Sequence, residues 1–384
     1  MQIGEVASFQ NGYAFKSKDF VQDGKYKTIK IKELKNGKVR FFNDSVSVNV
    51  DDERIIEKYI VEKGDVLFAL TGDPVNKNNP LSWVGRVSIY EDDQLALLNQ
   101  RVCKLVPNEE LNAKYIYYYF RAFNNFYALA SIAKGSASQA NISTKDIEAM
   151  EIDLPSLIIQ NKIVSVLDSI EEKINQNNKI NKNLEEQAQA IFKSWFVDFE
   201  PFNGNIPPDW KEYKLSEFLP VITGKKNANV SSISGLYPFF SCSQNLSWTD
   251  DYSFEGSAIL VAGNGDFNAK FYNGKFEAYQ RTYVLIPYNE KYTAWLYYAI
   301  KQNLKKITLA ARGSVIKFIT KGNLENFSFY APRDLDNFYI IDNFDATNNI
   351  IASNREENIR LSMLRDTLLP KLMTGELDVS NINL

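Results

Sequence analysis

Residues 161–199 read NKIVSVLDSIEEKINQNNKINKNLEEQAQAIFKSWFVDF, and the rest of the chain is organised around this stretch. Its apolar residues recur in alternating steps of four and three, which is typical of a coiled-coil seam rather than of the wider stripe of a globular helix. The seam positions are Ile163, Leu167, Ile170, Ile174, Leu184, Ala188, Ile191 and Trp195, with Asn177 and Asn181 between them. The stretch is therefore predicted to form one long helix that packs on another.

A weaker version of the pattern closes the sequence. Adding 177 to each seam number gives Ile340, Phe344, Thr347, Ile351, Asn354, Asn358, Leu361, Arg365, Leu368 and Leu372. A buried Asn is costly without a polar partner and is used to fix register. An antiparallel pair of helices would place Asn177 opposite Asn358 and Asn181 opposite Asn354. The globular segments before and between the helices favour this arrangement over a parallel pair, and two unrelated helices with locally exposed asparagines are the remaining alternative.

The segments that precede the two helices also repeat. The matched positions are Ile3, Glu5 and Gly12 with Leu215, Glu217 and Gly224; Gln100-Arg101 with Gln280-Arg281; Lys134-Gly135-Ser136 with Arg312-Gly313-Ser314; and Pro155 with Pro332. A globular segment followed by a long helix has thus been duplicated.

Each globular copy has the short β-branched and aromatic runs of a β-rich domain. We expect strands at residues 26–31, 65–70, 84–90, 101–106, 258–262 and 282–287, and helices at residues 115–126 and 294–304 whose tyrosines pack in the core. Pro370 should kink or restart the second long helix. The expected fold class is α+β, with two β-rich domains at residues 1–154 and 201–331, spacer helices at residues 155–200 and 332–384, an antiparallel two-helix coiled coil and a pseudo-two-fold internal repeat.

Composition limits the classes of function. The 384 residues are 45% apolar and carry a net charge of -3, so any affinity for nucleic acid must come from local basic faces. The two cysteines, Cys103 and Cys242, have no metal-ligand companions and are expected to be buried thiols. With no signal peptide and no apolar run of membrane length, a cytoplasmic protein without membrane association is expected.

The chain has no histidine, which excludes Ser/His/Asp and Cys/His nucleophilic sites, His-ligated zinc and His general bases. No phosphate-binding GxxxxGK[ST] is present, and Gly263-Asn264-Gly265 lacks the third glycine of a dinucleotide fingerprint. Carboxylate chemistry remains open, although no spacing singles out a pair. We therefore expect no catalytic, cofactor-binding or metal-binding residue in this chain.

Three features are candidates for DNA contact. Residues 16–40 hold nine basic and three acidic residues, among them Lys16 and Lys18, and are either a phosphate-binding face or a solvated surface. Gly/Asn-rich loops follow a predicted strand in each copy and either read bases or are ordinary turns. A cation beside Gly-Ser in each copy favours a phosphate held by backbone amides. The remaining candidates are Asn76, Lys77 and Asn78; Asn264; Lys134, Ser136 and Gln139; Arg312, Ser314 and Lys317; and Lys225 and Lys226 after Gly224.

The blocks at residues 154–202 and 364–377, with NGYAFKSKDF and GSASQANIS, resemble the DNA specificity subunit of type I restriction-modification systems. The resemblance covers nearly the whole chain. It implies two target recognition domains that each read half of a bipartite site in double-stranded DNA, and an antiparallel coiled coil that spaces them and docks two methyltransferase subunits. It also implies that S-adenosylmethionine, ATP and Mg²⁺ are bound by methyltransferase and restriction/translocase partners, and that this chain is not an enzyme.

The first copy departs from that pattern at its start. The second copy opens with Trp210 and Leu215 in WKEYKL, whereas Met1 already lies inside the corresponding motif. The resemblance implies that residues 376–384 fill the place of the missing strand.

Two other classes of function stay open. A coiled-coil protein-protein adaptor without DNA recognition is one. A methyltransferase acting alone would need an Asn/Asp-Pro-Pro-Tyr/Phe motif, but Pro207-Pro208 is preceded by Ile206 and followed by Asp209.

Overall fold

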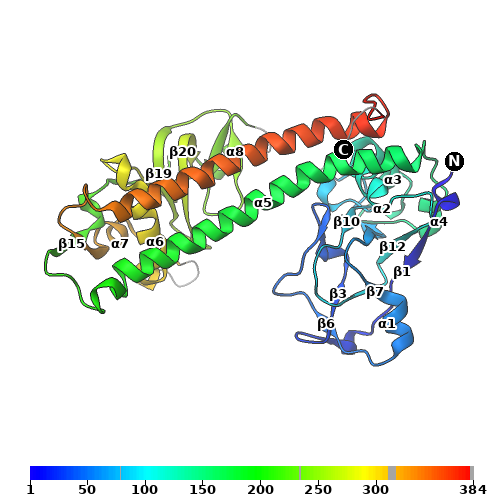
Figure 1. Cartoon of the computed structure of the whole chain (residues 1–384), viewed down its shortest axis with the longest axis horizontal. Coiled ribbons are helices and arrows are strands. Elements are labelled where there is room, and N and C mark those ends of the chain that lie inside the picture. The colour runs from blue at the N-terminus through cyan, green and yellow to red at the C-terminus, as the bar shows by residue number, and fades with distance from the viewer. Residues whose placement is uncertain (78, 233–234, 310–316, 381–384) are drawn as a thin grey trace. The chain divides into compact units, whose positions relative to one another are not determined.

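The computed structural model of the protein describes residues 1–77, 79–232, 235–309 and 317–380. The chain divides into two compact units (Figure 1). Unit 1 comprises Met1–Ile174 and Ile359–Leu384, and unit 2 comprises Asn175–Asn358. Each unit therefore contains one globular copy together with part of each long helix, whereas the expected boundaries after residues 154, 200 and 331 treat the helices as separate segments.

The described part of unit 1 contains three sheets. The largest has the spatial order β1 (Ala7–Asn11), β12 (Val102–Pro107), β8 (Val66–Ala69), β10 (Val87–Ile89), β5 (Lys38–Val39) and β4 (Leu34–Lys35). The second has the order β2 (Phe20–Val21), β6 (Ser47–Val48), β3 (Tyr26–Ile29), β11 (Ala96–Leu98) and β7 (Ile60–Val61), and α1 (Glu53–Tyr59) lies beside it (Figure 1). The third has the order β13 (Lys134–Ser136), β14 (Gln139–Asn141) and β9 (Thr71–Gly72). The four strands expected in this copy are all present, as β3, β8, β10 and β12.

The core of unit 1 lies between the largest sheet and short helices. All four residues of β8 are buried, which accounts for its continuous apolar run. The expected helix at residues 115–126 is instead two helices, α2 (Ala113–Tyr119) and α3 (Phe123–Ser131), and α4 (Thr144–Glu148) packs near β1. Tyr115, Tyr117 and Tyr118 are buried, so these tyrosines are core residues as expected and do not form a base-stacking platform.

Unit 2 repeats this plan with longer strands. Its large sheet has the order β16 (Val221–Thr223), β21 (Thr282–Leu285), β19 (Phe254–Ala262), β20 (Ala269–Ala278), β17 (Tyr237–Phe240) and β18 (Ser247–Thr249), and β15 (Trp210–Lys214) pairs separately with β22 (Ser328–Pro332). Helix α6 (Thr293–Leu309) packs against β19 and β20, and α7 (Lys321–Glu325) packs near β16. Trp295 and Tyr298 of α6 are fully buried, so the second set of aromatics is also core.

The two long helices are α5 (Leu157–Phe196) and α8 (Tyr339–Met373). In unit 2, Asn177 Nδ2 donates to Asn358 Oδ1 at 2.9 Å. Asn354 Nδ2 donates to Asn181 Oδ1 at 2.8 Å. Residue numbers rise along one helix as they fall along the other, so the helices are antiparallel and make the two asparagine contacts that this arrangement requires. In unit 1, Arg365 Nη1 donates to Glu171 Oε1 at 2.8 Å.

The seam differs from its expected course near the end of α5. Ile191 is 37% exposed, whereas Phe192 and Phe196 are buried and both contact the Phe344 ring. The interval of four residues from Ala188 to Phe192 to Phe196 gives a globular stripe, because this end of α5 packs into the core of unit 2 as well as on α8. The heptad pattern was therefore wrong at Ile191.

Two smaller expectations need correction. Helix α8 continues through Pro370 to Met373, so the expected restart is wrong; the missing N–H of Pro370 removes one i→i−4 hydrogen bond, and the helix continues for three residues after it. Cys103 is buried in β12, where burial raises the pKa of its thiol. Cys242 is only partly buried, with its Sγ 3.4 Å from the carbonyl of Arg281.

Candidate nucleic-acid interface

In unit 1, backbone hydrogen bonds join segments that lie far apart in the sequence, at the ends of strands of the largest sheet. The N–H of Gln100 donates to the carbonyl of Tyr13 at 3.0 Å. The N–H of Leu70 donates to the carbonyl of Arg101 at 2.9 Å, and Leu70 in turn accepts from the N–H of Ile142 at 3.0 Å. These bonds thus align four segments: the loop after β1, the loop after β8, the turn before β12 and the end of β14.

Unit 2 contains the same set of bonds. The N–H of Gln280 donates to the carbonyl of Lys226 at 2.9 Å. The N–H of Gly263 donates to the carbonyl of Arg281 at 2.9 Å, and Gly263 accepts from the N–H of Ile319 at 3.0 Å. We call these segments the strand-end loops: residues 12–15, 70–77, 99–101 and 134–142 in unit 1, and residues 224–226, 263–266, 279–281 and 317–319 in unit 2.

Two glycines allow these loops to approach so closely. A Cβ on Gly12 would lie 2.2 Å from the carbonyl oxygen of Asn99, and one on Gly224 would lie 2.2 Å from that of Ala278. No side chain fits at such distances, so glycine is required at both positions. The chain leaves β1 and β16 through these glycines and passes directly beside the turns that hold the Gln-Arg pairs.

In the sequence, these Gln-Arg pairs only mark the repeat, and no DNA-contacting role is predicted for them. In the structure Gln100, Arg101, Gln280 and Arg281 are all exposed to solvent. Packing explains why the two copies share identical residues at core positions. It does not explain why they share identical residues at solvent-facing positions. An identical polar dipeptide in otherwise diverged copies was therefore the signal that could have identified them as functional residues.

The β13–β14 hairpin brings two of the expected candidate features together. Strand β14 pairs with β9 through Ala140 and Gly72, so the Lys134 segment and the loop that begins at Thr71 form one surface. Thr71 Oγ1 donates to Asn141 Oδ1 at 2.8 Å and ties them further. The candidates Lys134, Ser136 and Gln139 are exposed.

The side chain of Lys134 is only weakly constrained by its neighbours. Its Nζ lies 4.0 Å from Asp146 Oδ1, and 86% of the lysine side chain is exposed. The carboxylate of Asp146 mainly accepts hydrogen bonds from Ser143, which lower the pKa of Asp146. The ammonium group of Lys134 is therefore available to an anion.

The loop after β9 is anchored by one tryptophan. Trp83 Nε1 donates to the carbonyl of Lys77 at 2.8 Å, and Trp83 pairs with Asp73 through a β-bridge. Asn76 and Lys77 are both exposed, whereas Asn78 lies outside the described residues. The described part of the loop thus has a fixed base and solvent-accessible polar side chains.

In unit 2 the corresponding surface is described in part. Asn264 pairs with Phe318 through a β-bridge and is partly buried, and Lys317 is exposed. Lys225 is exposed beside the Phe254 ring, and Lys226 is partly buried. The candidates Arg312 and Ser314 lie outside the described residues.

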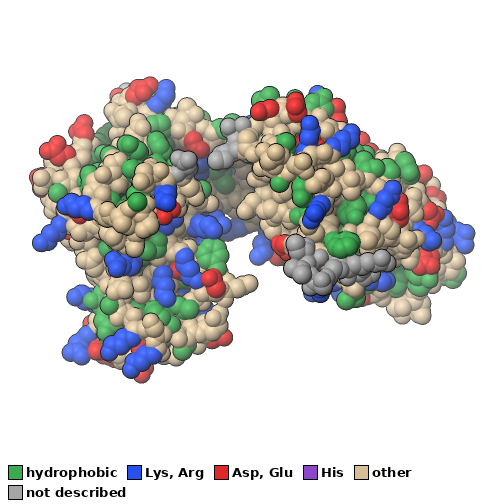
Figure 2. Space-filling model, turned by 180° about the vertical axis from the view of Figure 1, so that it is seen from behind, with side chains coloured by type: hydrophobic (Ala, Val, Ile, Leu, Met, Phe, Trp, Pro, Cys, Tyr) green, Lys and Arg blue, Asp and Glu red, His purple; other side chains and the backbone are tan. Residues whose placement is uncertain are grey.

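The basic stretch at residues 16–40 is less available than its sequence suggests. Lys32 pairs with Asp44 at 2.9 Å, and Lys38 pairs with Glu91 at 2.8 Å. Lys16 and Lys18 are exposed at the 3₁₀ turn Ser17–Asp19, which follows directly after the strand-end loop at residues 12–15. Figure 2 shows Lys and Arg side chains mixed with acidic ones over the part of unit 1 that carries β3, β6 and α1, as on a solvated surface.

The described residues contain no group of three or more Cys, Asp or Glu side chains placed to hold a metal ion. Among the helices in the described ranges, none is long and apolar enough to cross a membrane.

Comparison with known proteins gives one family. Its model, described as the type I restriction modification DNA specificity domain, matches residues 1–186 and 207–361. The EcoDI specificity subunit of Escherichia coli is 40% identical over 181 residues, which cover 45% of this chain and 40% of that protein. The MjaIX specificity subunit of Methanocaldococcus jannaschii is 24% identical in an alignment of 429 residues that covers 99% of this chain and 96% of that protein.

A solved structure supports the fold. The S subunit of a type I restriction-modification system from M. genitalium matches with a TM-score of 0.59 and 17% identity, over 97% of this chain and 95% of that one. The family model covers most of the sequence in two stretches, one for each copy of the repeat. The duplicated α+β chain with its two sets of strand-end loops therefore belongs to the family of type I restriction-modification DNA specificity proteins.

Proposed function

We propose that this chain reads a bipartite site in double-stranded DNA, with the strand-end loops of unit 1 on one half and those of unit 2 on the other. The observation that carries the proposal is the shared set of backbone bonds, which presents a solvent-accessible Gln-Arg pair at the same place in both units. Equivalent scaffolds with different loop residues suit a protein that reads two different short sequences.

The accessible side chains have suitable chemistry for base recognition. Arg forms bidentate hydrogen bonds with guanine, and Asn or Gln forms them with adenine. Arg101 and Arg281 are therefore assigned to base edges, together with Gln100 and Gln280. The exposed ammonium group of Lys134 is assigned to a phosphate, which positions the protein without reading sequence.

The long helices are assigned the role of a scaffold for two methyltransferase subunits. They expose isolated apolar side chains, including Ile180 at 47%, Ile350 at 49% and Met363 at 64%. A partner helix would remove these side chains from water at a gain of roughly 25 cal/mol per Å². S-adenosylmethionine, ATP and Mg²⁺ would be bound by the methyltransferase and restriction/translocase subunits, and this chain would contribute recognition without chemistry of its own.

The alternative function is a coiled-coil adaptor, which the exposed apolar side chains on α5 and α8 would equally serve. A gel-shift assay separates the two proposals. The chain co-expressed with its methyltransferase should retard duplex DNA and should prefer one sequence found by selection from a random pool. An assembled complex with no preferred DNA sequence would support the adaptor function and reject the specificity role.

A further inference from the structure

A further loop of unit 2 reaches the ends of its strands. Strand β17 pairs in parallel with β20. Where this pairing ends, the N–H of Tyr279 donates to the carbonyl of Phe240 at 2.9 Å. The chain therefore leaves β17 directly beside the turn that holds Gln280 and Arg281. We call residues 241–246, which follow β17, the β17 loop.

Side chains near the start of β20 hold the β17 loop in place. Asn268 Nδ2 donates to the carbonyl of Cys242 at 3.1 Å and to that of Asp266 at 2.7 Å. Lys270 Nζ donates to the carbonyl of Ser243. Asn268 is 8% exposed, so this anchor is buried. The β17 loop is thereby fixed to the strand-end loop that follows β19.

Gln244 is exposed in the β17 loop, and a hydrogen bond orients its amide. Its Nε2 donates to Asp266 Oδ2 at 2.8 Å. An ionised carboxylate only accepts hydrogen bonds, so Asp266 must face the NH₂ end of the amide and not the carbonyl end. No partner within the described chain is recorded for the second N–H or for Oε1 of Gln244. The amide is therefore held in one orientation, with one donor and one acceptor available.

This donor and acceptor complement the edge of an adenine. In the major groove, adenine presents its N6 amino donor beside the N7 acceptor, and the amide of a Gln or Asn side chain binds both. A phosphate is a poor ligand at this place, because the carboxylate of Asp266 would repel it. The chemistry of Gln244 therefore suits a base and not the DNA backbone.

Unit 1 has a different structure at the corresponding place. The N–H of Asn99 donates to the carbonyl of Ile29 at 3.1 Å, which corresponds to the bond from Tyr279 in unit 2. The next element of unit 1 is the 3₁₀ turn Ile31–Glu33, and the side chain of Glu33 is buried. An exposed and oriented glutamine after this strand is thus a feature of unit 2, so it would make the two half-sites differ.

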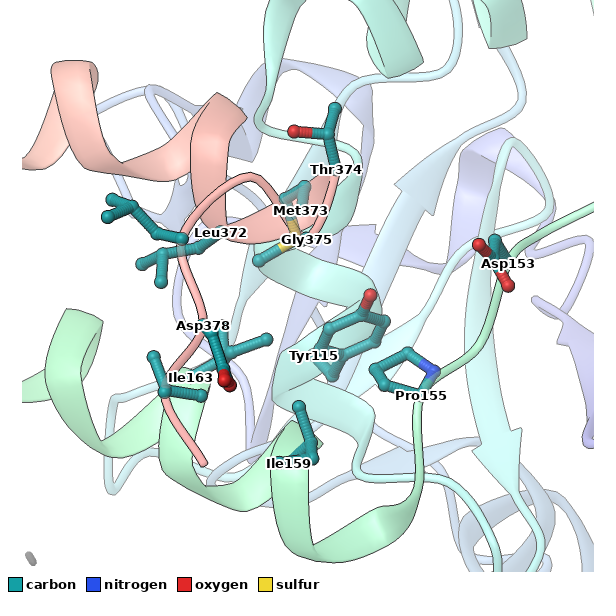
Figure 3. A pocket seen from close by; sticks show the side chains of 12 residues that line it. Tyr115, Asp153, Pro155, Ile159, Ile163, Leu372, Met373, Thr374, Gly375 and Asp378 are labelled. Atoms are coloured by element: carbon teal, nitrogen blue, oxygen red, sulfur yellow. The ribbon is translucent and has the colours of Figure 1, made fainter. Parts of the chain in front are cut away.

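A cavity of about 230 Å³ in unit 1 is a feature of another kind (Figure 3). It lies beside the last turn of α8 and the first turns of α5, and its walls are mainly apolar. Its described lining residues, which include Tyr115, Ile163 and Met373, contain none from a strand-end loop. Because it lies outside the loops that hold the candidate readers, the cavity is given no role in base recognition.

We propose that Gln244 reads an adenine in the half-site contacted by unit 2, and that Asp266 is the positioning residue for its amide. The assignment rests on the proposed DNA-reading function and names one base of the site. Gln244 Oε1 accepts a hydrogen bond from adenine N6, and the second N–H of Nε2 donates to adenine N7. Asp266 binds the first N–H and prevents the amide from turning over.

Thiol labelling tests whether the β17 loop faces DNA, without any change to the chain. The sequence has two cysteines, of which Cys242 is partly buried in the β17 loop and Cys103 is fully buried. In the complex with the methyltransferase, maleimide labelling of Cys242 is followed by mass spectrometry of its peptide. The selected duplex should slow this labelling several-fold, and an unrelated duplex at the same concentration should not. Equal labelling rates with and without saturating selected duplex would overturn the proposal.

Substitution of Gln244 identifies the base. Gln244→Ala should lower the preference for adenine at one base pair by roughly 5- to 150-fold, as expected for one bidentate contact, and should leave the other half-site unchanged. Competition binding with single-base variants of the selected site measures this effect, and the unchanged half-site shows that the variant is folded. Gln94→Ala is the matched control, because Gln94 is exposed and lies outside the strand-end loops.

Asp266→Asn tests the positioning role. The substituted side chain can donate as well as accept, so it no longer selects one orientation of the Gln244 amide. Asp266→Asn should weaken the preference at the same base pair, and should add no further loss there in a chain that already carries Gln244→Ala. An additive loss, or a preference for a different base at this pair, would show that Asp266 contacts a base itself and would overturn the positioning role.

Two results separate this assignment from the function on which it rests. If the parent complex selects no sequence, the DNA-reading function is rejected and the assignment is rejected with it. If the parent complex selects a site but Gln244→Ala leaves the preference at every base pair unchanged, only the assignment is overturned.

Discussion

At the scale of single residues, the two exposed arginines at the strand-end loops should each read one half of the DNA site. Arg101→Ala should cost about 1–3 kcal/mol of binding free energy and relax the preference at one base pair of one half-site. Arg281→Ala should do the same in the other half-site. Competition binding with single-base variants of the selected site measures both effects. If either substitution weakens all sequences alike, that arginine contacts phosphate and the assignment is wrong.

Lys134 is expected to behave differently, because its ammonium group is assigned to a phosphate. Lys134→Ala should weaken binding to all sequences alike and should reduce the slope of log K against log salt by about 1. Lys63→Ala is the matched control, because Lys63 pairs with Asp93 and lies outside the strand-end loops. A changed sequence preference with an unchanged salt slope would show that Lys134 reads a base.

The sequence was a partial guide to these residues. Lys134 could be named because a cation beside Gly-Ser recurs in both copies, and its exposure agrees with that role. Arg101 and Arg281 could not be assigned a role from the sequence alone. Only the backbone bonds from Leu70 and Gly263 place them beside the candidate loops, and such long-range pairing leaves no local pattern.

At the scale of elements, the asparagines between α5 and α8 should act as a pair. Asn177 is 1% exposed and donates to Asn358 and to Glu357. Asn177→Leu alone should cost about 1–3 kcal/mol, because it leaves acceptors without their donor. Asn177→Leu with Asn358→Leu should recover most of that loss, giving a coupling energy of about 0.5–3 kcal/mol in a double-mutant cycle by urea unfolding. Additive losses would mean that the two residues do not act on each other.

Glu185 should make the stability of unit 2 depend on pH. Burial raises the pKa of its carboxyl, but hydrogen bonds from Lys301 and Tyr297 outweigh burial and hold the pKa below its usual value. A lowered folded-state pKa contributes stability that is present above the unfolded value of about 4.3 and is lost as the pH falls through the folded value.

The corresponding substitution is Glu185→Gln, which keeps the shape and removes the charge. It should reduce the free energy of unfolding by about 1–3 kcal/mol at pH 7, and the difference from the parent should shrink below about pH 4. Urea unfolding at several pH values measures this. A difference that stays constant from pH 7 to pH 3 would show that the carboxylate charge contributes nothing.

The long helices show how much of the structure the periodicity of apolar residues can predict. Steps of four and three located α5, α8 and their asparagine contacts, because two helices that bury a narrow seam must repeat it. The pattern was wrong at Ile191, where the end of α5 also packs into the core of unit 2 and buries Phe192 instead. A globular surface changes the period, and nothing in the helix sequence marks where that surface begins.

At the scale of the whole molecule, the duplicated plan predicts that the two reading units are independent. Replacing Met1–Leu154 with the corresponding segment of a relative should change one half of the recognised site and preserve the other. Methylome sequencing of cells that carry the chimera and its methyltransferase provides the measurement. Changes in both halves would reject the modular account.

The duplication itself could be predicted from scattered identities, since glycines and prolines at turns tolerate little change. The resemblance implies that residues 376–384 take the place of a strand before the first copy, and residues 381–384 of this segment lie outside the described ones.

The central claim is that α5 and α8 set the distance between two independently read half-sites. Its most direct test inserts three heptads into each helix, after Asn181 in α5 and after Ser353 in α8, so that both asparagine pairs are kept. Twenty-one added residues lengthen a helix by about 32 Å at 1.5 Å per residue. This corresponds to about nine base pairs at 3.4 Å each, close to one turn of DNA, so both halves should still face the protein.

Circular dichroism and size-exclusion chromatography first establish that the lengthened chain folds and assembles with its methyltransferase. Methylome sequencing then reads the preferred site. The account predicts unchanged half-sites separated by a gap about nine base pairs longer. Continued methylation at the original spacing by the folded, assembled variant would contradict it.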